Sequence, residues 1–297
     1  MRTAFIEELI SLARVNPKIF LVVGDLGYSV VETFAREFPD RFLNAGVAEQ
    51  NMTGMAAGMA SEGFHVFTYS IANFPTFRCA EQIRNDIAYH NLPVTVVAVG
   101  GGVAYGNLGY SHHAVQDYAL MRSFPNMLIA APGDPMEVRA CLRYLIAHPQ
   151  PSYLRLGKAG EPFFHGSIPE VYPGQWLLVR GGQNNENLLL STGGALGTAI
   201  RCAEEQASWG YSVYSAPLWG MGHKNLQKEN IRSWSRVVTL EDHLADGGFG
   251  SWLLESLGEN SGLRERVSLR ALSPSICGMV ASQLSLMEIG GLADNSK

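Results

Sequence analysis

One glutamate in this sequence is well placed to do acid–base chemistry. Glu49 lies in the run NAGVAEQNMTGMAAGMA (residues 44–60), at the start of a predicted helix and among small apolar residues. A carboxylate in such surroundings is partly desolvated, which favours its neutral form unless a hydrogen-bond donor or a cation lies nearby. Composition alone supports equally well a solvent-facing glutamate that stabilises the helix dipole. Glu49 is therefore a candidate general acid or base, with a plain structural alternative.

Two adjacent histidines and two spaced phenylalanines are the next candidates. His112 and His113 lie in the loop LGYSHHAVQD (residues 108–117), where neighbouring side chains point in different directions. At most one of them is therefore expected to be catalytic, and the flank of a helix is the alternative. Phe74 and Phe77 stand three residues apart after a predicted strand, a spacing that by itself favours an ordinary core.

The glycine-rich loops do not match a nucleotide site. The sequence has no Gly-x-Gly-x-x-Gly between a strand and a helix in its first βα unit, and no Gly-x-x-x-x-Gly-Lys-Ser/Thr. The run GGGVAYGNLG (residues 100–109) leads into polar loop residues instead of a helix. This pattern favours a flexible loop over a pocket.

Alternating elements predict the scaffold that positions these residues. Short apolar runs followed by amphipathic segments are typical of parallel sheets with helices on both faces. In the first half, strands are predicted over 20–23, 42–44, 66–69, 94–99, 127–130 and 152–156, and helices over 4–14, 30–37, 49–62, 77–89, 115–122 and 135–147. In the second half, strands are predicted over 188–191, 212–216 and 237–240, and helices over 195–209 and 247–257.

The fold class is therefore α/β, with two domains that each hold a mostly parallel sheet flanked by helices. Residues 159–176 are rich in Gly, Pro and aromatic residues and lack periodicity, which indicates a connecting segment. We expect a first domain over 1–165, a linker over 166–176 and a second domain over 177–297.

Composition excludes several classes of function. The net charge of −5 and the pI near 5.9 indicate neither nucleic-acid binding nor attachment to an anionic membrane. The four cysteines are far apart, which excludes a recognisable zinc motif and a disulfide scaffold. The amphipathic N-terminus carries acidic residues, unlike a signal peptide, and no apolar run approaches the length of a membrane span. A cytoplasmic location is expected.

Five motifs, taken together and in order, resemble the C-terminal section of the transketolase family. They are GDLGYS (24–29), GVAEQNM (46–52), FxxFRxxEQIRN (74–85), GYSHHA (109–114) and TLEDHLADGGFG (239–250). The resemblance extends over nearly the whole chain, from about residue 2 to residue 293. It implies a pyrimidine-binding domain followed by a smaller C-terminal domain, in a subunit of a split transketolase that transfers a two-carbon ketol unit between sugars.

The resemblance also implies the cofactor thiamine diphosphate and assigns roles to single residues. Glu49 matches the family's glutamate on the pyrimidine ring nitrogen, and Phe74 and Phe77 match positions that stack on that ring. His112 matches the loop histidine that contacts the substrate oxygen, so Glu49 and His112 are the catalytic candidates. The remaining candidates are Asp25 at the cofactor, and Ser29, His113 and Lys158 at the substrate, with Lys158 near a family arginine that binds phosphate.

The sequence departs from the family where sugars are recognised. Gly106-Asn107-Leu108-Gly109 replaces an acidic Gly-Glu-Asp-Gly pattern, and Gly100 stands where the family has a further histidine. The substrates are thus expected to differ from ordinary pentose phosphates, while the cofactor-facing residues are kept.

The Gly-Asp-Gly motif that holds the diphosphate and its metal in this family does not occur in the sequence. The resemblance therefore implies a partner subunit, equivalent to the N-terminal half, that holds the diphosphate and Mg²⁺ or Ca²⁺, and an α2β2 assembly. Three alternatives stay open: a β-type subunit of a 2-oxo-acid dehydrogenase E1 component, a 1-deoxyxylulose-5-phosphate synthase-type subunit, and an inactive partner protein.

Overall fold

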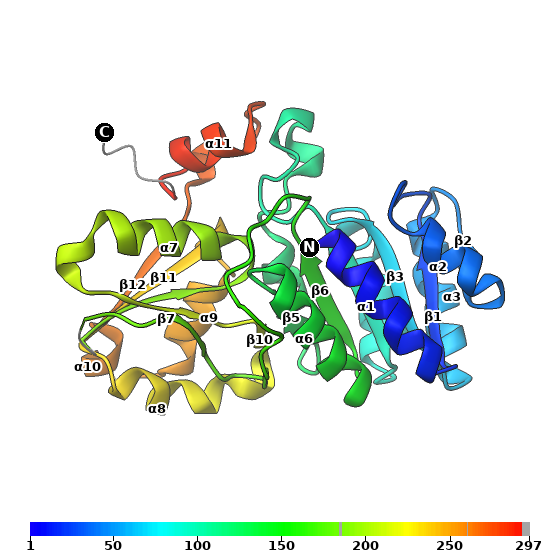
Figure 1. Cartoon of the computed structure of the whole chain (residues 1–297), viewed down its shortest axis with the longest axis horizontal. Coiled ribbons are helices and arrows are strands. Elements are labelled where there is room, and N and C mark those ends of the chain that lie inside the picture. Colours follow the sequence, from blue (N-terminus) through cyan, green and yellow to red (C-terminus); the bar gives the residue numbers. More distant parts are fainter. Residues whose placement is uncertain (184–185, 260, 293–297) are drawn as a thin grey trace.

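Two α/β units lie side by side in the computed structural model, which describes residues 1–183, 186–259 and 261–292 (Figure 1). The first unit is built on a seven-stranded sheet in the order β10-β5-β6-β4-β3-β1-β2. Its strands are β1 (Ile19–Val23), β2 (Phe42–Asn44), β3 (His65–Ile71), β4 (Val94–Val99), β5 (Leu128–Ala130), β6 (Ser152–Leu156) and β10 (Leu218–Trp219). All neighbours run parallel except β10 and β5.

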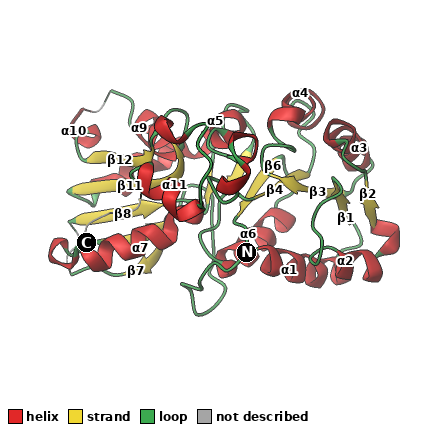
Figure 2. Cartoon of the chain, turned by 90° about the horizontal axis from the view of Figure 1, so that it is seen from above, coloured by secondary structure: helices red, strands yellow, loops and turns green. Residues whose placement is uncertain are grey.

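Helices cover both faces of this sheet. Its central strands β1 and β4 are runs of apolar, mostly β-branched residues that are buried along their whole length, as expected for a sheet covered on both sides. One face carries α1 (Arg2–Val15), α2 (Glu32–Glu37) and α6 (Pro135–Ala147), and the other carries α3 (Glu49–Ser61), α4 (Ala80–Gln82) and α5 (Asp117–Met121) (Figure 2). The helix predicted over 77–89 consists of a 3-10 turn, the short α4 and a π-helix at Ile83–Ala88.

The second unit has a five-stranded sheet in the order β12-β11-β8-β9-β7. Only the β7–β9 pair is antiparallel. The strands are β7 (Leu177–Arg180), β8 (Asn187–Ser191), β9 (Ser212–Ser215), β11 (Arg236–Leu244) and β12 (Val267–Leu272). Its helices are α7 (Leu196–Glu205), α8 (Gln227–Arg232), α9 (Phe249–Ser256), α10 (Ser261–Arg264) and α11 (Gln283–Ile289). The predicted fold class is thereby confirmed: both units hold a mostly parallel sheet between helices.

The two units are joined by more than the connecting chain. Strand β10 comes from the second half of the sequence, yet it extends the first sheet by pairing antiparallel with β5. Within β10, the indole of Trp219 packs edge-on to Phe249 and donates to the Thr192 hydroxyl at 3.1 Å. These contacts bury a shared core between the sheets.

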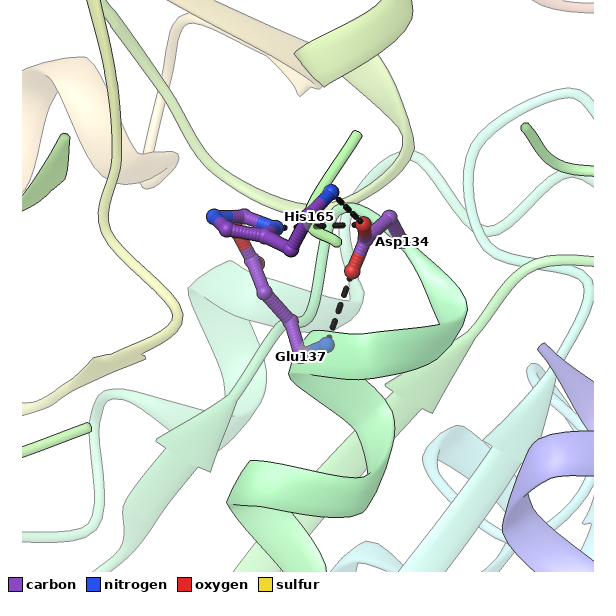
Figure 3. Close-up of side chains that lie close together, drawn as sticks. All are labelled: Asp134, Glu137 and His165. Atoms are coloured by element: carbon purple, nitrogen blue, oxygen red, sulfur yellow. Dashed lines mark hydrogen bonds and ion pairs between the residues drawn. The ribbon is translucent and has the colours of Figure 1, made fainter. Parts of the chain in front are cut away.

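The connecting segment is tied to the start of α6. Asp134 caps this helix, because its Oδ1 accepts a hydrogen bond from the backbone of Glu137 at 2.7 Å (Figure 3). The other carboxylate oxygen accepts from the backbone amides of Phe164 and His165, at 2.8 and 3.0 Å. The chain after β6 is thus fixed to the first unit before it enters the second.

The described residues contain no helix that is both long enough and apolar enough to cross a membrane.

Candidate functional site

Glu49 lies at the edge of the first sheet where ligands bind in parallel α/β folds. Strands β1, β3 and β4 are parallel neighbours, so their carboxyl ends share one edge. Glu49 begins α3 at this edge, close to the residue that follows β1: a Cβ built on Gly24 would lie 3.5 Å from Glu49 Cγ.

The carboxylate of Glu49 is buried and only half satisfied. Glu49 is 1% exposed, and its Oε2 accepts a hydrogen bond from Arg78 Nη1 at 2.6 Å. Oε1 is also buried and has no hydrogen-bond partner among the described residues. The cation required to offset desolvation is therefore present, and one carboxylate oxygen is left for a ligand. Arg78 belongs to one of the five motifs, yet its role was not predicted, because nothing in the spacing pairs it with Glu49.

A chain of ring contacts links Glu49 to His112. The Arg78 guanidinium lies 4.7 Å from the centroid of the Phe74 ring, on which it stacks. Phe74 in turn meets the His112 imidazole edge-on, with centroids 5.3 Å apart. The structure thus brings Glu49, Phe74 and His112 to one site. Phe77, next to Arg78 in sequence, is 46% exposed.

The loop that carries His112 is held at both ends. Gly102 forms a bridge with Ala114, and the Asn73 side-chain amide donates to the carbonyls of Ser111 and His113, at 3.1 and 2.9 Å. From the second unit, the segment at α11 packs on its middle: a Cβ on Gly106 would lie only 2.5 Å from Leu286 Cδ1. His112 is therefore presented by an ordered loop. Its pKa lies below the usual value, because burial and the neighbouring His113 both disfavour the charged form.

Tyr105 fills the space beside Gly100. Gly100 has φ +82°, and a Cβ at this position would lie 2.1 Å from the Tyr105 ring, so only glycine fits. The Tyr105 ring also approaches His112, with centroids 6.3 Å apart, and the Lys158 ammonium lies 5.1 Å from it. Tyr105 was not predicted from the sequence. Its ring lies between Lys158 and His112.

His113 differs from His112 in its surroundings. It is buried, and its Nε2 lies 3.3 Å from the Gly106 carbonyl oxygen. This contact links the two parts of the loop. Its Nδ1 has no partner among the described residues. The substrate role assigned to His113 stays a prediction, and its burial favours support of the loop.

Asp25 and Ser29 lie after β1, and Asp25 lines a pocket there. The Asp25 backbone amide donates to Asn44 Oδ1, and Asn44 Nδ2 donates to Asp25 Oδ1, both at 3.0 Å. The Ser29 amide donates to Glu32 Oε1 at 2.7 Å. Asp25 and Glu32 line a pocket of about 490 Å³, together with Tyr28. No hydrogen bond or ion pair between described residues joins Asp25 or Ser29 to Glu49 or His112, so their roles stay predictions.

A buried ionic network stands behind the loop, between the two units. Arg155 Nε donates to Asp117 Oδ2 at 2.7 Å, and its Nη1 donates to Asp242 Oδ1 at 2.5 Å. Arg155 Nη2 also donates to the Ala114 carbonyl at the end of the loop, at 2.7 Å. The network therefore fixes the His112 loop against β6 and β11 at once. Of this network, only the TLEDH segment stood out in the sequence.

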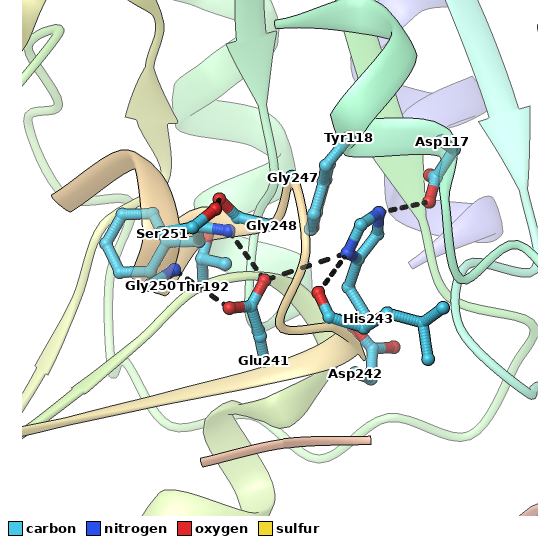
Figure 4. Close-up of polar contacts among 12 residues, drawn as sticks. Asp117, Tyr118, Thr192, Glu241, Asp242, His243, Gly247, Gly248, Gly250 and Ser251 are labelled. Atoms are coloured by element: carbon cyan, nitrogen blue, oxygen red, sulfur yellow. Dashed lines mark hydrogen bonds and ion pairs between the residues drawn. The ribbon is translucent and has the colours of Figure 1, made fainter. Parts of the chain in front are cut away.

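Around Asp242, the same segment adds two more buried groups (Figure 4). Glu241 accepts from the backbone amides of Phe249 and Gly250 at the start of α9, at 2.6 and 2.8 Å, and burial raises its pKa to about 8. His243 stacks on Tyr118, and burial lowers the pKa of its imidazole. These groups join α9 to the interface between the sheets.

Comparison with known proteins identifies the relatives of this chain. The sequence profile described as "Transketolase, pyrimidine binding domain" matches residues 1–160. The "Putative transketolase C-terminal section" of Methanocaldococcus jannaschii is 34% identical over 302 residues, which cover 100% of this chain and 93% of that protein. An apulose-4-phosphate transketolase subunit of Phocaeicola vulgatus is 34% identical over 277 residues, which cover 87% of this chain and 84% of that protein.

Solved structures give the same result. A structure titled "Split gene transketolase, inactive beta4 tetramer" superposes with a TM-score of 0.83 and 32% sequence identity, covering 98% of this chain and 93% of that one. The chain therefore belongs to the transketolase family, as a transketolase-type subunit equivalent to the C-terminal section.

Proposed function

We propose that this chain is the pyrimidine-binding half of a thiamine-diphosphate-dependent transketolase, which transfers a two-carbon ketol unit between sugars together with a diphosphate-binding subunit. The observation that carries the proposal is Glu49: a buried carboxylate with one oxygen on Arg78 and the other without a partner among the described residues, joined to His112 through Phe74. A buried acceptor without a partner is costly, so this oxygen is well suited to accept a hydrogen bond from a ligand.

The residues around Glu49 fit the pyrimidine ring of the cofactor. Glu49 Oε1 would hold a proton against a ring nitrogen of the cofactor, and the rings of Phe74 and Phe77 would offer apolar surface to its ring faces. Arg78 holds the other oxygen and thereby fixes the direction of Oε1. When bound, the cofactor supplies a carbon nucleophile that acts as an acyl-anion equivalent.

His112 acts on the substrate. A pKa below the usual value keeps its imidazole neutral near pH 7, so one ring nitrogen donates and the other accepts. A donor at this position stabilises the negative oxygen that develops as a carbon–carbon bond forms or breaks. Lys158 offers a positive charge on the same side, suited to an anionic acceptor.

A second chain completes the site in this proposal. The relatives from Phocaeicola vulgatus and Methanocaldococcus jannaschii are named as a transketolase subunit and as a transketolase C-terminal section. Large apolar side chains next to the site residues are exposed, namely Val47 at 74% and Phe77 at 46%. A partner chain that docks at this edge would cover both side chains. The partner holds the diphosphate and Mg²⁺ or Ca²⁺, and two copies of each chain form an α2β2 assembly.

A second candidate is favoured by one relative. The 1-deoxy-D-xylulose-5-phosphate synthase of Thermus thermophilus is 33% identical over 276 residues, which cover 91% of this chain and 43% of that protein. Enzymes of that type release CO2 from pyruvate, as do the 2-oxo-acid dehydrogenases, whereas a transketolase moves a ketol unit without loss of carbon.

Product analysis separates the two reactions. The chain is co-purified with the diphosphate-binding subunit of the same genome and incubated with a ketose donor and an aldose acceptor, or with ¹⁴C-carboxyl pyruvate. We expect a new ketose and no labelled CO2. Release of CO2 from pyruvate without ketol transfer would instead establish the second candidate, and turnover of neither substrate would support an inactive partner protein.

A further inference from the structure

Three side chains with metal-binding atoms gather where α6 begins (Figure 3). Asp134 and Glu137 belong to the first turn of the helix, and His165 comes from the connecting segment. The ligand atoms of the three side chains lie within 4.8 Å of one another. Both carboxylates are fully buried, and the imidazole is 11% exposed. They form the one cluster of this kind among the described residues.

Glu137 has an oxygen with no partner. Its Oε2 accepts from the Gly133 amide at 2.7 Å and from the Ser215 hydroxyl at 2.9 Å. Oε1 is buried, has no hydrogen-bond partner among the described residues, and lies 3.9 Å from His165 Nδ1. An unpaired buried carboxylate oxygen is costly, so its position in the cluster favours a cation as its partner.

We propose that Asp134, Glu137 and His165 bind one divalent metal ion, either zinc or a similar transition-metal ion. His165 Nδ1 lies 3.1 Å from Asp134 Oδ2 and 3.9 Å from Glu137 Oε1. Zinc ligands stand about 2.0–2.2 Å from the ion, so ligands at tetrahedral angles are about 3.4 Å apart, between these two values. The ion takes the place of the proton between His165 and Asp134, and water completes the coordination.

The donor set selects the type of metal. One imidazole nitrogen with two carboxylates suits zinc and similar transition ions, whereas Mg²⁺ prefers oxygen ligands alone. Two negative charges also balance the ion.

The position of the ion gives it a structural role. Asp134 and Glu137 belong to the first unit, His165 to the connecting segment, and Ser215, which donates to Glu137, to β9 of the second sheet. An ion at this point fixes all three parts together. This role is independent of the thiamine site, so the proposal stands or falls without regard to the catalytic function.

The test is a titration of ZnCl2 into the metal-free full chain, with equilibrium dialysis for stoichiometry and thermal melting for stability. We expect one Zn²⁺ per chain and a higher melting temperature, because a ligand that binds only the folded state stabilises it. MgCl2 at the same concentration should not raise the melting temperature.

Glu137→Gln and His165→Asn should each weaken Zn²⁺ binding by at least about 100-fold, because loss of an outer-shell partner of a ligand alone costs about 10–100-fold. The controls are Glu62→Gln and His90→Asn, which change exposed residues of the same types and should bind like the wild type. Failure of the wild-type chain to bind Zn²⁺, or equal binding by all four variants, would overturn the proposal. If the site variants do not fold, the anomalous map of a Zn²⁺-soaked wild-type crystal decides: a peak among the three side chains supports the site, and its absence refutes it.

Discussion

Among single residues, Glu49 has the clearest assigned task. It is buried, its position at the start of α3 is fixed, and one of its oxygens faces no partner among the described residues. We expect Glu49→Gln to keep the fold, because glutamine has nearly the same shape and can still accept from Arg78. Turnover of the assembled enzyme should fall about 10²–10⁴-fold, the usual loss for a general acid or base. Steady-state kinetics checks this, and turnover within about threefold of wild type would show that Glu49 does not share a proton in the reaction.

His112 should affect the substrate steps and spare the cofactor. His112→Ala removes one donor to a developing oxygen charge, so we expect turnover to fall about 10²–10³-fold. Thiamine diphosphate binding by the assembled enzyme, measured by calorimetry, should stay unchanged because His112 reaches Glu49 only through Phe74. His90→Ala, on an exposed histidine, is the control, and His113→Ala should reduce turnover less than His112→Ala. An equal loss of affinity and turnover in His112→Ala would contradict the assignment.

At the residue scale, the sequence predicted those site residues that belong to recognisable motifs. Glu49, Phe74 and His112 were singled out and lie together in the structure. Arg78 and Tyr105 were missed as parts of the site, because their contacts depend on how strands and loops meet in space. The Arg78–Glu49 ion pair joins residues 29 positions apart, and no local pattern reveals such a pairing.

At the scale of elements, the Arg155 network holds β6, α5 and β11 together. Arg155 and Asp117 are almost fully buried, and Asp242 nearly so. Arg155→Met leaves two buried carboxylates without their cation, so we expect a loss of about 3–5 kcal/mol in the free energy of unfolding. Urea denaturation followed by tryptophan fluorescence measures this. Arg180→Met, which breaks the exposed pair with Glu204, is the matched control and should cost at most about 1 kcal/mol. Equal losses in both variants would contradict the proposed role of the network.

His65 on β3 makes the first sheet sensitive to acid. Burial lowers its pKa to about 4, and its Nε2 shares a hydrogen bond with Thr95 Oγ1 at 2.9 Å. Between about pH 6.5 and 4, His65 is therefore protonated in the unfolded chain but neutral in the folded chain. The contribution of His65 to the free energy of unfolding is complete above about pH 6.5 and is lost as the pH falls towards about 4.

His65→Gln keeps a partner for Thr95 and does not titrate. We expect the urea midpoint of this variant to change less than that of the wild type between about pH 6.5 and 4. At about pH 4, the variant should avoid a loss of about 3 kcal/mol in the free energy of unfolding, from about 2.5 pH units at about 1.36 kcal/mol each. His90→Gln should leave the profile unchanged, and a His65→Gln profile as steep as wild type would refute the role assigned to His65.

The sequence predicted the interior elements better than the edges. Runs such as IFLVV and VTVVAV are buried on both faces and carry a strong signal, and they match β1 and β4. Strands β7 and β12 were missed because they are edge strands that are only partly buried along most of their length. The two-residue β10 is too short to read from sequence, and its pairing with β5 depends on the second unit folding back on the first.

For the whole molecule, the proposed function places only part of the cofactor site on one chain. This chain offers the pyrimidine side, with Glu49, Phe74 and His112. The diphosphate contacts are assigned to a partner, and such charge-assisted hydrogen bonds contribute about 1.5–3 kcal/mol each. Two of them account for at least about a hundredfold in affinity.

The most direct test is a calorimetric titration of thiamine diphosphate with Mg²⁺, first into the isolated chain and then into its mixture with the diphosphate-binding subunit. We predict binding to the isolated chain that is at least about 100-fold weaker than to the mixture. One cofactor should bind per pair of unlike chains, with ketol transfer appearing only in the mixture. Tight Mg²⁺-dependent binding to the isolated chain would contradict the central claim, because the diphosphate would then be held by this chain itself.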